Sequence, residues 1–277
     1  MAQSKSFFGL RRGSTKSLTF STFNGKQVTK DRVTDVKNPR TEAQMINRML
    51  NYTAMSAYSA MKEIVDHSFA SKSYGLQSMR HFLSKNYSLL KYGKDTLFYS
   101  SYKGGMVPSL YLVSEGSLPG VPFNVNTTDG TMTIALDGNT FADLKKATGL
   151  SEGDYITAIC LTDVKETPFT WLRVYIPEGD GSETITSIAS LTIESNVNAS
   201  EFLEVVAGAS NKVSLKFTSS RNVLATGTII ASAKKGDTWQ RSTCYMQNLS
   251  DDGSPNFEKA LATYPVGASY ILNGGDK

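Results

Sequence analysis

Residues 155–176 read YITAICLTDVKETPFTWLRVYI, and this stretch decides the fold class. It holds two runs of β-branched, aromatic and aliphatic residues, Tyr155–Thr162 and Thr170–Ile176, joined by a short polar segment. Each run has the length of a strand and is too short for an ordinary helix. We therefore predict two strands of an antiparallel sheet here.

Similar runs continue on both sides of this stretch, and turn signals such as Asp129-Gly130 separate many of them. The other predicted strands are Ser109–Val113, Thr131–Leu136, Ser190–Glu194, Lys212–Thr218, Gly227–Ala233 and Trp239–Leu249. Ser and Thr together number 60, which is typical of a β-rich, hydroxyl-covered protein. About eight strands at this spacing predict an antiparallel, immunoglobulin-like β-sandwich over residues 105–277.

Residues 1–104 have a different pattern. Leu18 and Phe20 alternate with polar residues ahead of Asn24-Gly25, which favours a β-hairpin because both turn positions need positive φ. Apolar residues then recur at spacings of three and four, which predicts helices from about residue 42 to residue 66 and from about residue 76 to residue 90. The predicted fold class is α+β: an N-terminal β-hairpin and helical pair, then the β-sandwich domain.

Charge is distributed unevenly between these two parts. Residues 1–104 hold 17 Lys and Arg against 6 Asp and Glu, a net charge of +11. Residues 105–277 hold 12 against 19, a net charge of −7, so the total of +4 conceals the asymmetry. A basic front joined to an acidic back indicates interaction surfaces rather than catalysis.

The residues that chemistry would need are scarce. The chain has two histidines and two cysteines, and no phosphate-binding loop. No nucleophile, base and orienting acid can be assembled from the sequence, so we predict a protein that is not an enzyme and that holds no cofactor and no metal. No run approaches 18 apolar residues, so no membrane contact is expected.

The basic arm at the start of the chain is the strongest functional candidate. Its residues are Arg11, Arg12, Lys16, Lys26, Lys30, Arg32 and Arg40, with Phe side chains interleaved. Such a segment fits docking onto an acidic protein surface, for which the acidic back of another copy is available. It also fits binding to a phosphate backbone, and a solvated hairpin is the third alternative.

Two further sets of residues are candidates for interaction. The first predicted helix carries Met45, Met49 and Met61 on an apolar stripe. Core packing explains such a stripe, and part of it could meet the β domain or a neighbouring subunit. The second set is aromatic and supports a third functional class, a carbohydrate- or surface-binding sandwich. Its members are Trp171, Tyr175, Trp239 and Tyr245.

Two motifs carry a resemblance. Asn-Pro-Arg-Thr-Glu-Ala-Gln at residues 38–44, followed by Arg48, and Trp-Gln-Arg-Ser-Thr at residues 239–243 resemble a protein family of Bacteroidota and their gut phages, including the crAss-like phages. The likeness is specific over residues 9–70 and 227–249. Family members often have an aromatic-Lys/Arg-Gly turn in the first hairpin, where this chain has Phe-Asn-Gly-Lys at residues 23–26.

The resemblance implies a structural component of a phage virion or phage-like particle, in its capsid, neck or tail. Its expected partners are other copies of itself and other virion proteins, and its expected location is the virion, after assembly in the cytoplasm of the bacterial host. The alternative from the residues alone is a nucleic-acid-binding module that contacts DNA through the basic arm.

Overall fold

A computed structural model describes residues 2–4, 13–14, 17–23, 26–32, 41–92, 108–162, 168–179, 181–219, 225–236 and 238–250. Contacts within the chain divide it into two compact units, Met1–Thr41 and Glu42–Lys277, which we call the N-terminal unit and the main unit. We predicted a boundary near residue 104. The structure instead groups the helices with the strands that follow them.

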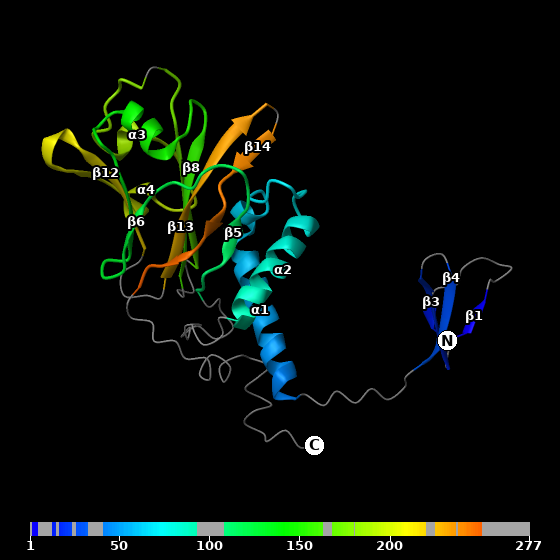
Figure 1. Cartoon of the computed structure of the whole chain (residues 1–277). Coiled ribbons are helices and arrows are strands. Elements are labelled where there is room, and N and C mark those ends of the chain that lie inside the picture. Colours follow the sequence, from blue (N-terminus) through cyan, green and yellow to red (C-terminus); the bar gives the residue numbers. More distant parts are fainter. Residues whose placement is uncertain are drawn as a thin grey trace. The chain divides into compact units, whose positions relative to one another are not determined.

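The N-terminal unit is a four-stranded antiparallel sheet with the order β1-β4-β3-β2. Its strands are β1 Ala2–Ser4, β2 Gly13–Ser14, β3 Leu18–Phe23 and β4 Lys26–Asp31. Strands β3 and β4 form the predicted hairpin, in which Phe23 pairs with Lys26 (Figure 1). The turn residues 24 and 25 lie outside the described residues. Strands β1 and β2 were not predicted.

The main unit begins with two helices, α1 Glu42–Val65 and α2 Leu76–Tyr92, close to the predicted bounds. The Tyr87 hydroxyl donates to the Asn47 side chain at 2.9 Å, and the Ser78 hydroxyl donates to the Asp66 carbonyl at 2.8 Å. The start of each helix therefore lies beside the end of the other, so the pair is antiparallel, as expected.

Three sheets complete the main unit, and each of their strand pairs is antiparallel. The six-stranded sheet has the order β10-β9-β8-β13-β14, with β16 also paired to β13; its strands are β8 Tyr155–Thr162, β9 Phe169–Tyr175, β10 Thr192–Ser195, β13 Ala225–Lys235, β14 Thr238–Arg241 and β16 Gln247–Asn248. The four-stranded sheet has the order β11-β12-β7-β6; its strands are β6 Asn124–Asn126, β7 Thr131–Ala135, β11 Leu203–Ala207 and β12 Val213–Thr218. Strands β5 Leu112–Ser114 and β15 Cys244–Tyr245 pair with each other, and the remaining helices are α3 Phe141–Thr148 and α4 Ala199–Phe202.

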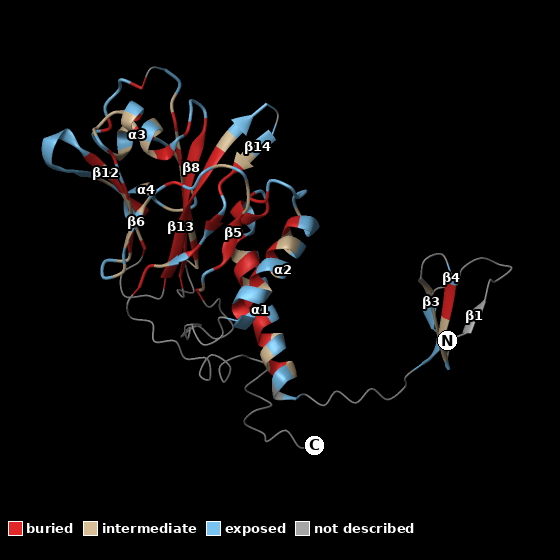
Figure 2. Ribbon diagram, viewed as in Figure 1, coloured by how far each residue is buried: buried red, intermediate tan, exposed pale blue. Residues whose placement is uncertain are grey.

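Strand β8 explains how these layers are arranged. All eight of its residues are buried (Figure 2), and successive side chains of a strand point to opposite faces. Ile156 and Ala158 belong to a hydrophobic cluster shared with the four-stranded sheet, whereas Ile159 and Leu161 belong to a second cluster shared with α1 and α2. The six-stranded sheet is therefore the middle layer, with helices on one face and the smaller sheet on the other.

The fold is thus α+β with antiparallel sheets, which confirms the predicted fold class. The second cluster also accounts for the unit boundary, because it joins Leu50 of α1 and Phe82 of α2 to Ile230 of β13. Burial of these apolar helix faces against the sheet stabilises both layers. The charge boundary near residue 104 consequently falls inside one compact unit.

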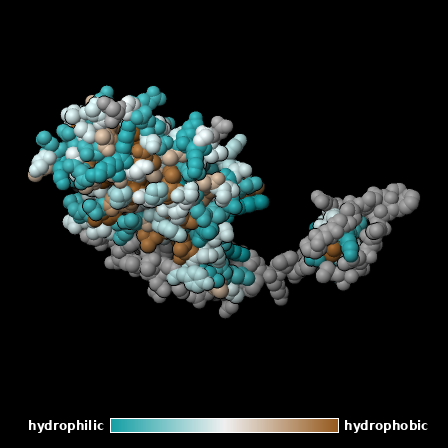
Figure 3. All heavy atoms as spheres, turned by 45° about the horizontal axis from the view of Figure 1, so that its top comes forward, coloured by the Kyte–Doolittle hydropathy of each residue, from teal (hydrophilic) through white to brown (hydrophobic). Residues whose placement is uncertain are grey.

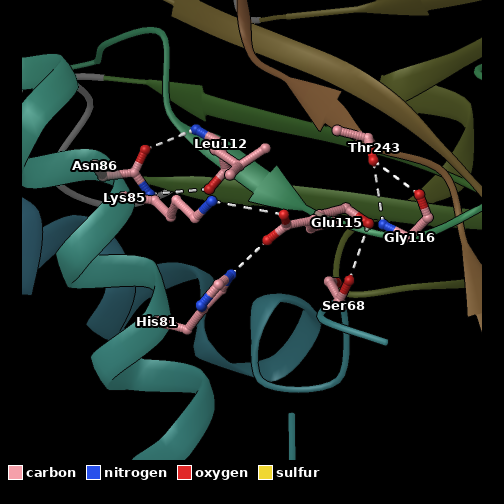
Figure 4. A network of polar contacts seen from close by, with 9 residues as sticks. Ser68, His81, Lys85, Asn86, Leu112, Glu115, Gly116 and Thr243 are labelled. Atoms are coloured by element: carbon pink, nitrogen blue, oxygen red, sulfur yellow. Dashed lines mark hydrogen bonds and ion pairs between the residues drawn. The ribbon is translucent and has the colours of Figure 1, made fainter. Parts of the chain in front are cut away.

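Polar contacts fix α2 against strand β5 (Figure 4). The buried Asn86 amide donates to the Leu112 carbonyl at 2.9 Å and accepts from the Leu112 N–H at 2.7 Å. Just beyond β5, Glu115 lies 2.5 Å from His81 Nε2 and 3.6 Å from Lys85 Nζ. The hydrogen bond with His81 lowers the pKa of Glu115, and Lys85 adds to this effect.

Candidate interaction sites

The described part of the N-terminal unit includes three of the predicted basic residues. Lys26, Lys30 and Arg32 are exposed, and the first two lie in β4. Strand periodicity places Lys26, Val28 and Lys30 on one face, where Ser21 of β3 is the partner of Val28. Arg11, Arg12, Lys16 and Arg40 lie outside the described residues. The structure therefore shows a basic strand face, which we define as Lys26, Lys30 and Arg32.

The N-terminal unit has little core among its described residues. Gln27 and Val28 are the buried ones, while Leu18 and Phe20 remain partly exposed. A small sheet is stable in water when three or more strands share a hydrophobic face, or when it packs against another layer. The residues of this unit whose burial is described provide only a small part of such a face.

The methionine stripe lies in the core of the main unit. Met45, Met49 and Met61 are all buried and belong to the cluster between the helices and the six-stranded sheet. The sequence left open whether this stripe packs in the core, against the β domain or against a neighbouring subunit. The three methionines pack in the core, against the six-stranded sheet. They are not exposed as a surface for a neighbouring subunit.

A third set of side chains forms an alternating row of rings and guanidinium groups on the helix-side face of the six-stranded sheet. We call it the Arg–aromatic ladder and define it as Trp171, Arg173, Tyr155, Arg241 and Trp239. The Arg173 guanidinium carbon lies 4.9 Å from the Trp171 ring centroid and 5.3 Å from that of Tyr155. The Arg241 guanidinium carbon lies 5.4 Å from Tyr155 and 5.3 Å from Trp239. Tyr155 is therefore contacted by both cations.

Strand register builds the ladder. Tyr155 of β8 pairs with Ser232 of β13, and Ser232 pairs with Arg241 of β14, so these residues share a row across three strands. Trp171 and Arg173 are two residues apart in β9, and so are Trp239 and Arg241 in β14. A period of two keeps each pair on one face. Cation–π contacts of this kind stabilise by about 0.5–2 kcal/mol each, more when they are desolvated.

The two cations have different surroundings. Arg173 donates to Glu194 at 2.8 Å, and the Tyr175 hydroxyl donates to the same carboxylate oxygen at 2.7 Å. These hydrogen bonds, that of Tyr175 foremost, lower the pKa of Glu194. Arg241 donates to the Tyr155 hydroxyl at 2.9 Å, and no Asp or Glu among the described residues lies within ion-pair distance of it. Burial lowers the pKa of this guanidinium.

The sequence identified part of the ladder. Trp171 and Trp239 of the ladder, and Tyr175 beside it, were candidates for surface binding. The rings of Tyr175 and Trp239 contact that of Tyr155, and Trp171 is connected to Tyr155 through Arg173. Tyr245, the fourth candidate, is exposed in β15 and makes none of these contacts. The arginines of the ladder were missed. Their signal was the pattern Trp-x-Arg-x-Tyr in one predicted strand and Trp-x-Arg in another.

Three further features of the described residues concern metal binding, thiol reactivity and membrane insertion. No three His, Cys, Asp or Glu side chains among them gather as a metal site would require. Cys160 and Cys244 are free and buried, and burial raises the pKa of both thiols, that of Cys160 to about 12. No helix in the described part of the chain is long and apolar enough to cross a membrane. The face of the main unit seen in Figure 3 is largely hydrophilic, with hydrophobic residues scattered over it.

Comparison of the chain with protein-family models, with curated proteins and with solved structures finds no match.

Proposed function

We propose that the protein is a structural component of a phage virion or phage-like particle, and that its N-terminal unit makes contacts between subunits. The observation that carries this proposal is how little the described strands of residues 1–41 bury, since Gln27 and Val28 are the buried ones among the residues whose burial is described. Two buried side chains contribute little to the stability of four short strands, and a partner surface that covers these strands adds to it. In a homo-oligomer, each copy supplies that surface to the next.

The net charges of the two units also favour another copy of the chain as the partner. Residues 1–41 hold 9 Lys and Arg against 2 Asp, a net charge of +7, whereas residues 42–277 have a net charge of −3. Opposite net charges on the two units favour association of the N-terminal unit of one copy with the main unit of another. The resemblance to phage-associated proteins over residues 9–70 includes this unit. Other virion proteins are the second class of partner within the proposal, and the virion is the proposed location.

The proposal extends to the fold. Two antiparallel sheets that share one hydrophobic cluster are the arrangement of a β-sandwich, and we propose an immunoglobulin-like one. Such compact sandwiches hold position in particles while extended segments reach neighbouring copies. No step of the proposal needs a catalytic residue or a cofactor.

Cross-linking distinguishes contacts between copies from contacts within one. Equal amounts of unlabelled and 15N-labelled protein are mixed, assembled and treated with an amine-reactive cross-linker. We expect cross-links from Lys26 and Lys30 to join a labelled peptide to an unlabelled one. Cross-links from these lysines that join only peptides of the same isotope would contradict subunit contacts through this unit.

A nucleic-acid-binding module is the second candidate, and the basic strand face favours it. Lys26 and Lys30 project from one face of β4 beside the hydroxyls of β3, which suits contacts to phosphates. Binding of this kind falls steeply with salt, and removing two phosphate contacts lowers the slope of log K against log salt by about two. A 20-base-pair DNA duplex titrated at several salt concentrations tests this candidate, and no affinity at low salt would exclude it.

A further inference from the structure

The Arg–aromatic ladder holds a positive charge that the described residues do not neutralise. Arg241 is more than nine-tenths buried, and a guanidinium stays ionised even when burial lowers its pKa. The nearby carboxylates are already engaged. Glu194 accepts from Arg173 and Tyr175, and Asp154 accepts the backbone N–H groups of Ser151 and Lys234. A buried cation without a counter-charge is costly, which makes an added anion favourable here.

One end of the ladder is open to solvent. Trp239 is 39% exposed, whereas Trp171 at the other end is 3% exposed. Lys234 pairs with Trp239 and Ser232 with Arg241 across β13 and β14, so the side chains of Lys234, Trp239 and Arg241 lie on one face of the sheet. Lys234 is exposed as well. A partner that reaches this end meets an indole ring with Lys234 opposite it on β13 and Arg241 two residues further along β14.

We propose that this end of the ladder binds a carboxylate-bearing segment of a protein partner. The carboxylate lies against Arg241 and Lys234, and the apolar part of the neighbouring residue packs on the Trp239 ring. Trp, Tyr and Arg are the side chains that most often dominate the energy of protein–protein contacts. The guanidinium fork matches the geometry of a carboxylate. This site is on the main unit and is independent of the function proposed for the N-terminal unit.

The charge of the surroundings favours a peptide over a nucleic acid. A single strand of DNA or RNA is held by a track of exposed cations with several stacking rings. This end of the ladder offers one exposed tryptophan and one exposed lysine, and the main unit has a net charge of −3. Long-range repulsion therefore opposes a polyanion, whereas one acidic side chain needs only the local field of Arg241.

Trp239 provides the assay, because the chain has two tryptophans and the other one is buried. Tryptophan fluorescence of the full-length protein is followed during titration with the peptide (Glu-Gly-Phe-Gly)3, with (Gln-Gly-Phe-Gly)3 and with an oligothymidylate of eight nucleotides. We expect a saturable change with the Glu peptide and none with the Gln peptide. Calorimetry of the same titration measures the affinity without relying on the indole.

Four variants locate the binding. Arg241→Gln and Lys234→Gln remove cations of the site, and we expect affinity for the Glu peptide to fall about tenfold or more for the first and less for the second. Trp239→Ala changes an exposed residue, so its loss of binding by calorimetry tests the site even if Arg241→Gln fails to fold. Arg80→Gln removes the same charge from an exposed position on α2 and is the matched control. It should bind like the parent.

Each other outcome overturns the proposal. Binding of the oligothymidylate with no binding of the Glu peptide would assign the site to nucleic acid. Equal binding of the Glu and Gln peptides would show that the cations do not recognise a carboxylate. If neither peptide nor oligonucleotide binds, the ladder is a stabilising element of the sheet.

Discussion

Replacing Asn86 with Ala should destabilise the main unit strongly, because its amide makes the two backbone hydrogen bonds that a neighbouring strand would otherwise make to β5. Its amide satisfies both backbone groups of Leu112 on the side of β5 that faces α2, at 2.7 and 2.9 Å. Asn86 and Leu112 are both buried, so water does not easily replace the amide. Leaving two buried backbone groups without partners costs about 1–3 kcal/mol each, or about 2–6 kcal/mol together.

Urea unfolding followed by circular dichroism measures this change, with the free energy of unfolding taken from linear extrapolation. The matched control is Asn51→Ala on α1, where an exposed amide donates to a carbonyl of its own helix at 2.9 Å. We expect that substitution to change the free energy of unfolding by less than about 0.5 kcal/mol. Both variants should keep one cooperative transition, because the helices and the six-stranded sheet share a core.

Equal stability of Asn86→Ala and Asn51→Ala would refute this reasoning, since it would mean that α2 does not depend on its contact with β5. A transition that separates into a helical step and a sheet step would also contradict it. That result would restore the boundary between helices and strands that the charge distribution predicted.

Three other substitutions or conditions test the packing and electrostatics. Gly227→Ala should cost about 1–3 kcal/mol of stability in the same unfolding assay, because its Cβ would lie 2.8 Å from a carbonyl oxygen of β8; Gly120→Ala, where nothing lies within 4 Å, is the control and should be neutral. The hydrogen bond with His81 lowers the pKa of Glu115 in the folded state, so this carboxylate contributes stability above its unfolded pKa and loses it as the pH falls through the folded pKa. Glu115→Gln should therefore weaken the acid dependence of unfolding, and an unchanged pH profile would exclude this contribution. Both cysteines are free and buried, and burial raises the pKa of Cys160 to about 12, so neither should react with a thiol reagent at pH 8 until urea is added; rapid labelling of the folded protein would show that a thiol is accessible.

Local sequence patterns predicted much of the secondary structure. The run Tyr155–Thr162 became strand β8 with the same bounds, and the helical periodicity gave both long helices within two residues at each end. Short elements were missed, because β1, β2 and β6 have only two or three residues and no repeat of polarity to detect. The predicted strand Trp239–Leu249 is broken into β14, β15 and β16, which pair with two different strands.

The arrangement of layers could not be read from periodicity. An apolar run such as β8 indicates a strand buried on both faces, but it does not say which elements cover each face. The methionine stripe on α1 fitted a subunit contact as well as a core, and the position of the six-stranded sheet decided between them. Net charge is a property of surfaces, so its change near residue 104 carried no information about the core.

The Arg–aromatic ladder likewise depends on strand order, which sequence periodicity does not reveal. The pairs Trp171 with Arg173 and Trp239 with Arg241 are visible in the sequence as residues two apart in predicted strands. The contact that joins them runs through Tyr155, which is 86 positions from Arg241 in the chain. It exists because β13 lies between β8 and β14, and that strand order depends on tertiary packing.

The most direct measurement of the central claim is sedimentation velocity of the full-length protein over a wide range of concentration. Subunit contacts through the N-terminal unit predict an assembled species that the double variant Lys26→Glu, Lys30→Glu shifts toward the monomer. The double variant Lys72→Glu, Lys91→Glu makes the same charge change at exposed positions of the main unit and should leave the assembly intact. A monomer at every concentration, or an equal effect of the two double variants, would contradict the account.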